Sequence, residues 1–177
     1  MGPMDRARRA SPVTPVPALV LGIAPHTMAG AALWRETTLE KVFETESAAG
    51  AARVAYEAVH FAKRKSLELA VVLGRGDERV ERIFADALAE HGHRRRYVVR
   101  VYPAQWHRVL GEGLDFKGPV EWQGAAQGWC ESFLGPKVAL GLEVAEAAAI
   151  GYWGVFSVEV RQALGLRRLV SAEGGSS

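Results

Sequence analysis

Two glutamates, Glu143 and Glu146, stand three residues apart near the start of an apolar stretch, "LEVAEAAAIGYWGVF", that begins at Leu142. Residues three apart are neighbours on one face of a helix, so the two carboxylates are expected side by side. Closely placed carboxylates hold hard divalent ions such as Mg²⁺, which prefers oxygen ligands. Acids in a first helical turn also complement the helix dipole. Two interpretations of Glu143 and Glu146 therefore remain: magnesium ligands, or acids that complement the dipole at the start of a helix.

Polar residues in two other short segments could join these acids. Asp77 and Glu78 follow an apolar strand pattern in "GRGDERVERIF", where acids either cap the next helix or reach a site at the end of a sheet. His26 closes the strand-like run "LVLGIAPHT" and is either a surface histidine or a ligand or general base. The "GRGDE" stretch lacks the lysine and the serine or threonine of a P-loop, so it gives little support to nucleotide hydrolysis.

The elements that would position these residues follow from the apolar periodicity. Three strands come first, then a helix capped by Ser47, a nearly continuous apolar strand, a second helix that stops at Gly92, another strand, and further helices that open at Pro119 and Leu142. The expected strands are 18–24, 32–37, 39–45, 67–74 and 97–102, with Gly30 in a turn. This order predicts a mixed α/β sheet, with a three-strand antiparallel meander leading into parallel strands flanked by helices, as in the ribonuclease H-like fold.

Bulk composition indicates one folded domain. The 177 residues carry a net charge of +2 and are 49% hydrophobic, and no apolar run approaches the roughly 20 residues that span a bilayer. The single cysteine, Cys130, excludes an internal disulfide and a cysteine-built zinc site, and it is expected in the core. We expect a cytoplasmic protein with a folded domain over 18–168, a flexible, basic, proline-rich arm over 1–17 and a flexible tail over 169–177.

Basic residues gather in clusters although the net charge is small. Lys63 and Arg64 lie in the expected last turn of the first helix, and Arg94, Arg95 and Arg96 follow the second helix. Such runs are ordinary at helix C-termini because cations complement the dipole there. Clustered cations also contact nucleic-acid phosphates. The basic clusters can therefore be interpreted either as solvated helix ends or as a nucleic-acid-binding surface.

Four segments, in this order along the chain, resemble a known family. The strand "LVLGIAPHT" is similar to an opening strand with the pattern GIDPGT, and "LAVVLG" to a central strand that ends in a glutamate. "YPAQWHRVLG" resembles a proline-led segment after the next strand, and "LEVAEAAAIGYWG" a terminal acidic helix. Together they resemble the RuvC-type Holliday-junction resolvases over about residues 18–156. The resemblance implies a homodimeric, magnesium-dependent nuclease that binds four-way DNA junctions and cuts the backbone symmetrically.

The acids of that family carry over only in part. The first-strand aspartate falls on Ala24, and the central-strand glutamate falls on Gly74, or on Leu73 if the register slips by one. The two terminal-helix acids fall on Glu143 and Glu146, which would be the remaining metal ligands. Two-metal catalysis needs carboxylates from several elements to hold both ions, so half of the expected site is missing.

Two more positions enter through this resemblance. His26 replaces a glycine of the first-strand turn, and Lys117 corresponds approximately to a lysine that faces the DNA backbone. The leading hypothesis is a RuvC-like homodimer that binds branched DNA, with weak or lost nuclease activity and Mg²⁺ bound weakly or not at all. Lys63, Arg64, Lys117 and some of Arg94 to Arg96 would contact the phosphates.

Two alternatives accompany this hypothesis. One is an active junction-resolving endonuclease with a rearranged site made of Glu143, Glu146 and Asp77 or Glu78. The other is a protein-interaction scaffold that keeps the fold and binds no nucleic acid. A basic surface beside the altered acidic site would favour nucleic-acid binding over the scaffold, because fold alone does not determine function.

Overall fold

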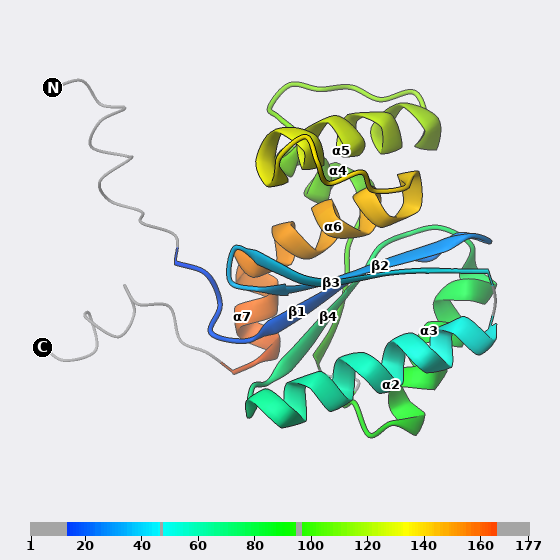
Figure 1. Ribbon diagram of the computed structural model, residues 1–177, viewed down its shortest axis with the longest axis vertical. Coiled ribbons are helices and arrows are strands. Elements are labelled where there is room, and N and C mark those ends of the chain that lie inside the picture. Colours follow the sequence, from blue (N-terminus) through cyan, green and yellow to red (C-terminus); the bar gives the residue numbers. More distant parts are fainter. Residues whose placement is uncertain (1–13, 47, 95–96, 166–177) are drawn as a thin grey trace, which may run out of the picture.

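The computed structural model describes residues 14–46, 48–94 and 97–165, which form a central sheet with helices on both sides (Figure 1). The strands are β1 (Leu19–Ala24), β2 (Ala29–Arg35), β3 (Thr38–Thr45), β4 (Leu69–Leu73) and β5 (Val98–Arg100). The helices are α2 (Ala48–Lys65), α3 (Glu78–Glu90), α4 (Pro103–Trp106), the 3-10 helix η2 (His107–Val109), α5 (Pro119–Leu134), α6 (Leu142–Val155) and α7 (Val158–Ala163). Within these residues, none of the helices combines the length and the apolar character needed to cross a membrane.

The sheet has the strand order β3-β2-β1-β4-β5 and mixed directions. β1, β2 and β3 form an antiparallel meander, whereas β4 runs parallel to β1 and β5 runs parallel to β4. This topology confirms the predicted mixed α/β sheet. Because β1, β4 and β5 are parallel, they all end at one edge of the sheet, which we call the carboxyl edge. Ala24 and Gly74 both lie at this edge.

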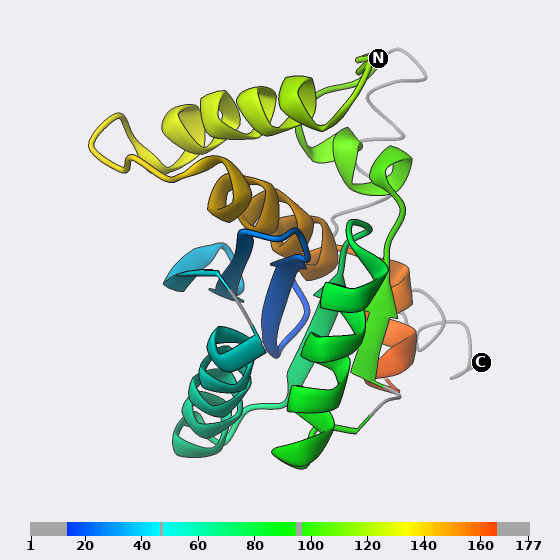
Figure 2. The same cartoon turned by 90° about the vertical axis from the view of Figure 1, so that its right-hand side faces the viewer.

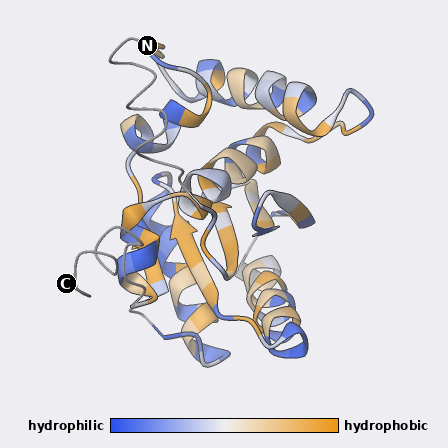
Figure 3. Cartoon of the chain, turned by 90° about the vertical axis from the view of Figure 1, so that its left-hand side faces the viewer, coloured by the Kyte–Doolittle hydropathy of each residue, from blue (hydrophilic) through white to orange (hydrophobic). Residues whose placement is uncertain are grey.

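Alternation along the strands divides the core into two layers. Leu19, Leu21 and Ile23 of β1 pack with α2 and α3, while Val20 and Ala24 pack with α6 on the other face. Helices α2 and α3 cover one face of the sheet, and α6 lies across the other with α5 outside it (Figures 1 and 2). The central strands are hydrophobic over most of their length, as Figure 3 shows. Such strands are expected where a sheet is covered on both faces.

Glycines allow α6 to approach the sheet at backbone contact distance. A Cβ atom on Gly22 would lie 2.2 Å from the carbonyl oxygen of Ala147, and one on Gly30 would lie 2.3 Å from that of Glu143. Trp34 Nε1 also donates a hydrogen bond of 3.0 Å to the carbonyl of Ala148. The Gly30 contact places the first turn of α6 directly over the start of β2, near the carboxyl edge, and the Gly22 and Trp34 contacts hold the middle of α6 against the sheet.

Several element boundaries differ from the sequence-based expectation. Strand β2 begins at Ala29, not at residue 32, and Gly30 lies inside the strand, not in a turn, because it faces the α6 backbone. Strand β4 ends at Leu73, one residue before Gly74, and β5 covers only Val98–Arg100. The short helices α4 and α7 were not expected, since four to six residues carry little periodicity. Cys130 is 1% exposed and lies in the core, as predicted.

The described chain begins before the expected domain boundary at residue 18. Val16 is fully buried, and its N–H donates a hydrogen bond of 2.8 Å to the carbonyl of Val155. Residues 14–17 therefore pack on the domain. Residues 1–13 of the arm expected over 1–17 lie outside the described residues, as do the cap Ser47, Arg95 and Arg96. Residues 166–177, which include the end of the expected domain and the tail, also lie outside them.

Candidate functional site

Two short connections pack together at the carboxyl edge and position His26. The N–H of Gly74 donates to the carbonyl of Ile23, and the N–H of Asp77 donates to the carbonyl of Pro25, both at 2.9 Å. A Cβ atom on Gly76 would lie 2.9 Å from His26 Nδ1, so glycine is needed for this close approach. The turn after β1 and the loop after β4 are thereby fixed against each other, and the imidazole of His26 is directed toward α6.

Glu146 is the centre of a buried polar cluster on α6. It is 1% exposed, and its Oε2 atom lies 2.6 Å from His26 Nε2. Trp122 Nε1 donates to Oε1 at 2.8 Å, and Gln123 Nε2 donates to Oε2 at 3.1 Å. Three side chains from the β1 turn and from α5 thus satisfy a carboxylate that would otherwise be costly to bury.

Electrostatics favour the protonated form of His26. The hydrogen bond to Glu146 raises the pKa of His26, and partial burial opposes this effect by favouring the neutral ring. The negative charges of Glu146, Glu143 and Asp77 raise the pKa of His26 further. The side chain of His26 is 22% exposed, so the ring lies between the buried glutamate and solvent. The arrangement favours an imidazolium–carboxylate pair.

Ala24 and Gly74, the two positions where the sequence resemblance predicted acids, lie at the same edge of the sheet as this pair. Ala24 is fully buried and belongs to the core layer under α6. A Cβ atom on Gly74 would lie 2.6 Å from Ile150 Cδ1, so this position also faces α6. Carboxylates at 24 and 74 would therefore point toward the side of the sheet that carries Glu146. Leu73 instead belongs to the layer under α2 and α3, on the opposite face of the sheet from Glu146.

The donor set present does not fit a magnesium site. Glu146 uses both oxygens to accept hydrogen bonds from protein donors, and neither Ala24 nor Gly74 offers a side-chain oxygen. Among the residues that the structure describes, no three His, Cys, Asp or Glu side chains are grouped so that they could hold a metal ion. A magnesium ion needs several oxygen ligands in near-octahedral geometry, which this set lacks.

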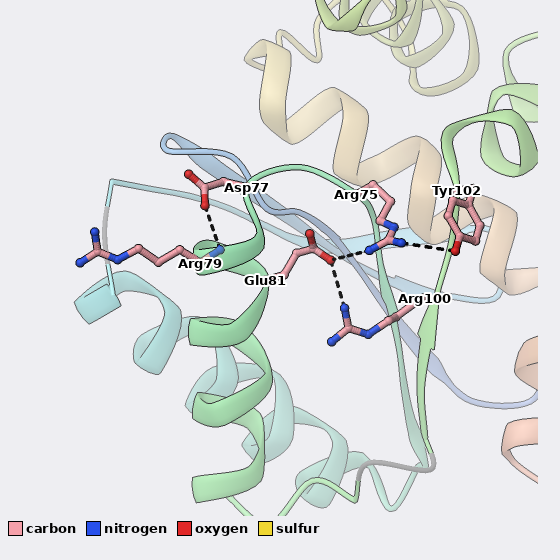
Figure 4. A network of polar contacts seen from close by, with 6 residues as sticks. All are labelled: Arg75, Asp77, Arg79, Glu81, Arg100 and Tyr102. Atoms are coloured by element: carbon pink, nitrogen blue, oxygen red, sulfur yellow. Dashed lines mark hydrogen bonds and ion pairs between the residues drawn. The ribbon is translucent and has the colours of Figure 1, made fainter.

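Asp77 and Glu78 have other surroundings. Asp77 Oδ1 accepts a hydrogen bond of 2.9 Å from the N–H of Arg79 and caps α3, and Figure 4 shows its carboxylate directed away from Glu81. Glu78 is exposed and lines a pocket between α3 and β5. The capping interpretation of Asp77 therefore describes its contacts, although its charge still acts on His26.

Aromatic side chains extend the site along the outer side of α6. The ring of His107 lies 5.0 Å from that of Trp122 and 4.9 Å from that of Phe116, measured between centroids. Burial lowers the pKa of His107, and its Nε2 atom is buried without a hydrogen-bond partner in the described part of the chain. The same rings line a pocket of about 550 Å³ under the loop 110–118. Lys117 is exposed in this loop, near the Glu146 cluster.

The remaining predicted basic residues lie elsewhere. Lys63 and Arg64 end α2 just before β4 begins, and Arg94 precedes β5, so all three lie at the edge where the parallel strands start (Figure 1). Lys63 and Arg94 line one shallow pocket there. The structure thus brings Glu143, Glu146, His26 and Asp77 together at the carboxyl edge, and it places the predicted helix-end cations at the opposite edge.

Two partners of Glu146 were not identified from the sequence. Trp122 and Gln123 are adjacent on α5, yet one donates to each oxygen of the carboxylate. The available signal was the helical spacing of Trp122, Ala126, Trp129 and Phe133 after Pro119, which indicates that Trp122 lies on the apolar side of a helix but not what its indole N–H contacts. Tryptophan N–H groups usually find a partner when they are buried, and that rule alone pointed to an acceptor nearby.

The fold is shared with structures of known proteins. RuvC from T. thermophilus, solved in complex with a Holliday junction substrate, is similar with a TM-score of 0.57 and 17% identity, over 84% of this chain and 96% of that chain. The Thermus thermophilus RuvC structure is similar with a TM-score of 0.51 and 20% identity, over 83% and 96%. No family model and no curated protein matches the sequence. These similarities confirm a RuvC-like, ribonuclease H-like fold.

Proposed function

We propose that this protein binds branched DNA of the Holliday-junction type and has little or no nuclease activity, as a pseudo-nuclease of RuvC-like fold. The observation that carries the proposal is the state of Glu146. Its two oxygens accept hydrogen bonds from His26, Trp122 and Gln123 at the place where the fold would support a metal-binding acid. A carboxylate held in this way has little capacity left for a divalent ion.

The His26 imidazolium supplies a positive charge next to Glu146. In a nuclease of this fold, metal ions would neutralise the acids and contact the scissile phosphate. Here a side chain of the protein neutralises Glu146, and the acids expected at positions 24 and 74 are replaced by Ala24 and Gly74. Lower negative charge at this edge reduces the repulsion of a phosphate backbone without supplying the ions that cut it.

Lys117 supports a DNA surface at the same edge. It is exposed on the loop that covers the His107 and Trp122 rings, and no hydrogen bond or ion pair described for this region engages its ammonium group. The similar RuvC structure contains a Holliday junction substrate, and this chain matches 96% of that one. We assign Lys117 to phosphate contact, and we assign Lys63, Arg64 and Arg94 to weaker, long-range attraction from the far edge.

A homodimer is part of this proposal. A four-way junction is formed by four strands, and a two-fold symmetric pair of subunits would contact its opposite strands equally; two-fold pairs are also the commonest oligomers. Tyr56 on α2 is 53% exposed and stacks on His60 at 5.4 Å between ring centroids, so α2 offers an aromatic surface for a second copy. Light scattering at micromolar concentration should give a dimer mass, and a monomer mass would remove this part.

The test combines binding and cleavage. Fluorescence anisotropy with a labelled four-way junction and a linear duplex of the same sequence, over a salt series, should show junction-selective binding that weakens as salt rises. The Lys117→Ala variant should bind more weakly with a shallower salt dependence. Incubation of the junction with Mg²⁺ or Mn²⁺ should give no products.

Each failure has a distinct meaning. Absence of binding even at low salt would favour the protein-interaction scaffold. Equal affinity for the junction and the duplex would keep DNA binding and remove its structural selectivity. Paired symmetric nicks that disappear in Glu146→Gln would instead establish an active resolvase with a rearranged site.

A further inference from the structure

We infer that Arg75 and Arg100 form a built phosphate-binding pair for the DNA backbone, on the face of the sheet opposite to Glu146. This inference rests on the proposed function, which it deepens by naming a contact that neither the basic clusters nor the family resemblance indicated. The pair is formed at the carboxyl edge by two adjacent parallel strands. Arg100 ends β5, where it pairs with Leu73 of β4, and Arg75 lies two residues after the end of β4.

Glu81 of α3 holds the two guanidinium groups beside each other. Its Oε1 atom lies 3.2 Å from Arg100 Nη1 and 3.8 Å from Arg75 Nη1, and the residue is 2% exposed. Figure 4 shows Glu81 directed from the helix toward both arginines. The buried carboxylate of Glu81 orders both arginine side chains before a ligand binds. Ligand binding then costs less conformational entropy than it would with two mobile arginines.

Tyr102 orders Arg75 from the other side. The phenol oxygen accepts a hydrogen bond of 3.3 Å from Arg75 Nη2, and the guanidinium carbon lies 4.8 Å from the centre of the Tyr102 ring. The Arg75 guanidinium is therefore held between Glu81 and Tyr102, as Figure 4 shows. A planar guanidinium that is fixed in this way presents its remaining N–H donors in a defined direction, which suits phosphate oxygens.

Both arginines remain open to a ligand. The side chains of Arg75 and Arg100 are 40% and 55% exposed, although Glu81 beneath them is buried. Each guanidinium has five N–H donors, and Glu81 and Tyr102 account for only part of them. The pair lines a pocket of about 470 Å³ between α3 and β5. One buried carboxylate, that of Glu81, thus orients two exposed guanidinium groups.

The other charged residues of the pocket determine where a phosphate would lie. Glu78 and Asp86 also line it, and both are on α3, together with Arg82. The two arginines of the pair are at the strand ends, so a phosphate is expected on the strand side, next to Tyr102, and away from the helix acids. Tyr102 is 58% exposed, so its ring could contact the sugar or base next to the bound phosphate.

The test measures junction affinity and its salt dependence in full-length protein. The double variant Arg75→Ala with Arg100→Ala should bind the labelled junction about tenfold more weakly at 0.1 M salt, with a log–log salt slope smaller by about 0.9, as for one lost phosphate contact. Lys63→Ala with Arg64→Ala removes the same charge at the far edge and should lose much less. Unfolding monitored by circular dichroism checks that each variant is folded.

A second variant separates the organised pair from simple net charge. Glu81→Gln makes the protein more positive while loosening the arginines, so it should weaken junction binding, and Arg75→Lys should weaken it as well. Stronger binding by Glu81→Gln would overturn the inference, because long-range charge would then dominate. Equal losses in the two double variants would overturn it for the same reason.

The remaining outcomes also decide the matter. A parent protein that binds the junction, with an unchanged double variant, would overturn this inference and leave the proposed function intact. A parent that binds no DNA would remove both. Inorganic phosphate, compared with chloride at matched ionic strength, tests a free anion as the ligand. A thermal stabilisation by phosphate that disappears in the double variant, with DNA binding unchanged, would also overturn the assignment to DNA.

Discussion

Two buried glutamates lie near the carboxyl edge of the sheet, on opposite faces, and their partners differ. Glu146 on α6 is 1% exposed, and Glu81 on α3 is 2% exposed. Glu146 accepts hydrogen bonds from an imidazole, an indole and an amide, all of which point inward. Glu81 contacts the guanidinium groups of Arg75 and Arg100, which reach solvent. Glu146 is thus enclosed by its partners on the α6 face, whereas Glu81 holds two solvent-exposed arginines on the α3 face.

The comparison teaches that burial and position do not by themselves identify a metal-binding acid. A carboxylate has about four acceptor sites, and protein donors use three of them in Glu146. Its role is then to join the β1 turn, α5 and α6. Glu81 has cationic partners that stay hydrated, so its role is to organise them. The donors around each acid, more than its sequence position, separate structural from binding roles.

The largest expected effect is on stability after removal of Glu146. Glu146→Ala should lower the free energy of unfolding by about 3 kcal/mol, because it leaves a partly buried imidazolium and the N–H donors of Trp122 and Gln123 without their acceptor. Glu81→Ala should cost only about 1 kcal/mol, because Arg75 and Arg100 are solvent-exposed and can be hydrated again. Urea unfolding followed by circular dichroism measures both values.

Glu143→Ala is the matched control, since this acid lies three residues before Glu146 on α6 and is only half buried. It should change stability by less than about 0.5 kcal/mol. If Glu143 and Glu146 were instead an empty metal cage, their mutual repulsion would be relieved by either substitution. Stabilisation by both variants without metal would therefore contradict the structural role of Glu146.

Much of the fold could be predicted from the sequence because the strong signals are local. The apolar run around Leu69–Leu73 and the helical spacing in α2 and α3 specify elements whatever lies beside them. Gly30 shows the limit: glycine next to small residues suggests a turn, but here the neighbouring helix requires it inside a strand. That requirement comes from α6, more than a hundred residues later in the chain.

The candidate site was less predictable for the same physical reason. Glu146 and His26 could each be identified as unusual, but they are 120 residues apart and only the tertiary structure pairs them. Arg75 and Arg100 are single arginines in the sequence and become a pair through strand adjacency. Conversely, Lys63 and Arg94 belong to basic runs that are conspicuous in the sequence, yet both residues lie at the edge away from the acids.

A smaller effect is expected from pH. The pKa of His26 is raised in the folded protein by Glu146, with Glu143 and Asp77 adding to this effect. The unfolded value is about 6.5, so the folded state binds the proton more tightly. The stabilisation is then complete below about pH 6.5 and is lost as the pH rises through the higher folded pKa. The stability difference between the parent and His26→Gln should therefore shrink from pH 6 to pH 9 in urea unfolding.

His93 supplies a control of opposite sign. Burial lowers the pKa of His93, and its Nε2 atom lies 2.8 Å from the carbonyl oxygen of Leu69. The contribution of such a group is present above the unfolded pKa and is lost as the pH falls. The difference between the parent and His93→Gln should therefore shrink toward low pH. An unchanged difference for His26→Gln across the whole range would rule out the imidazolium–carboxylate pair.

The smallest expected effect is that of divalent metal on the parent protein. A ligand stabilises the folded state by RT ln(1 + [L]/Kd), so a site with a Kd of about 0.1 mM would add about 2.7 kcal/mol at about 10 mM metal. Glu146 is engaged by three donors and Ala24 and Gly74 carry no oxygen, so 10 mM Mg²⁺ or Mn²⁺ should leave Tm within about 1 °C of its value in NaCl of equal ionic strength. The variant Ala24→Asp with Gly74→Glu places two acids on the α6 face, where a Cβ atom at position 74 would lie 2.6 Å from Ile150 Cδ1 and 3.1 Å from the carbonyl oxygen of Ile23. It should be less stable than the parent without metal, because the new acids repel Glu143 and Glu146, and it should gain more from Mn²⁺. A rise of several degrees in the Tm of the parent protein with metal would show that a metal ion displaces His26 from Glu146. Glu146 would then be a metal ligand, and its contrast with Glu81 as a purely structural acid would be wrong.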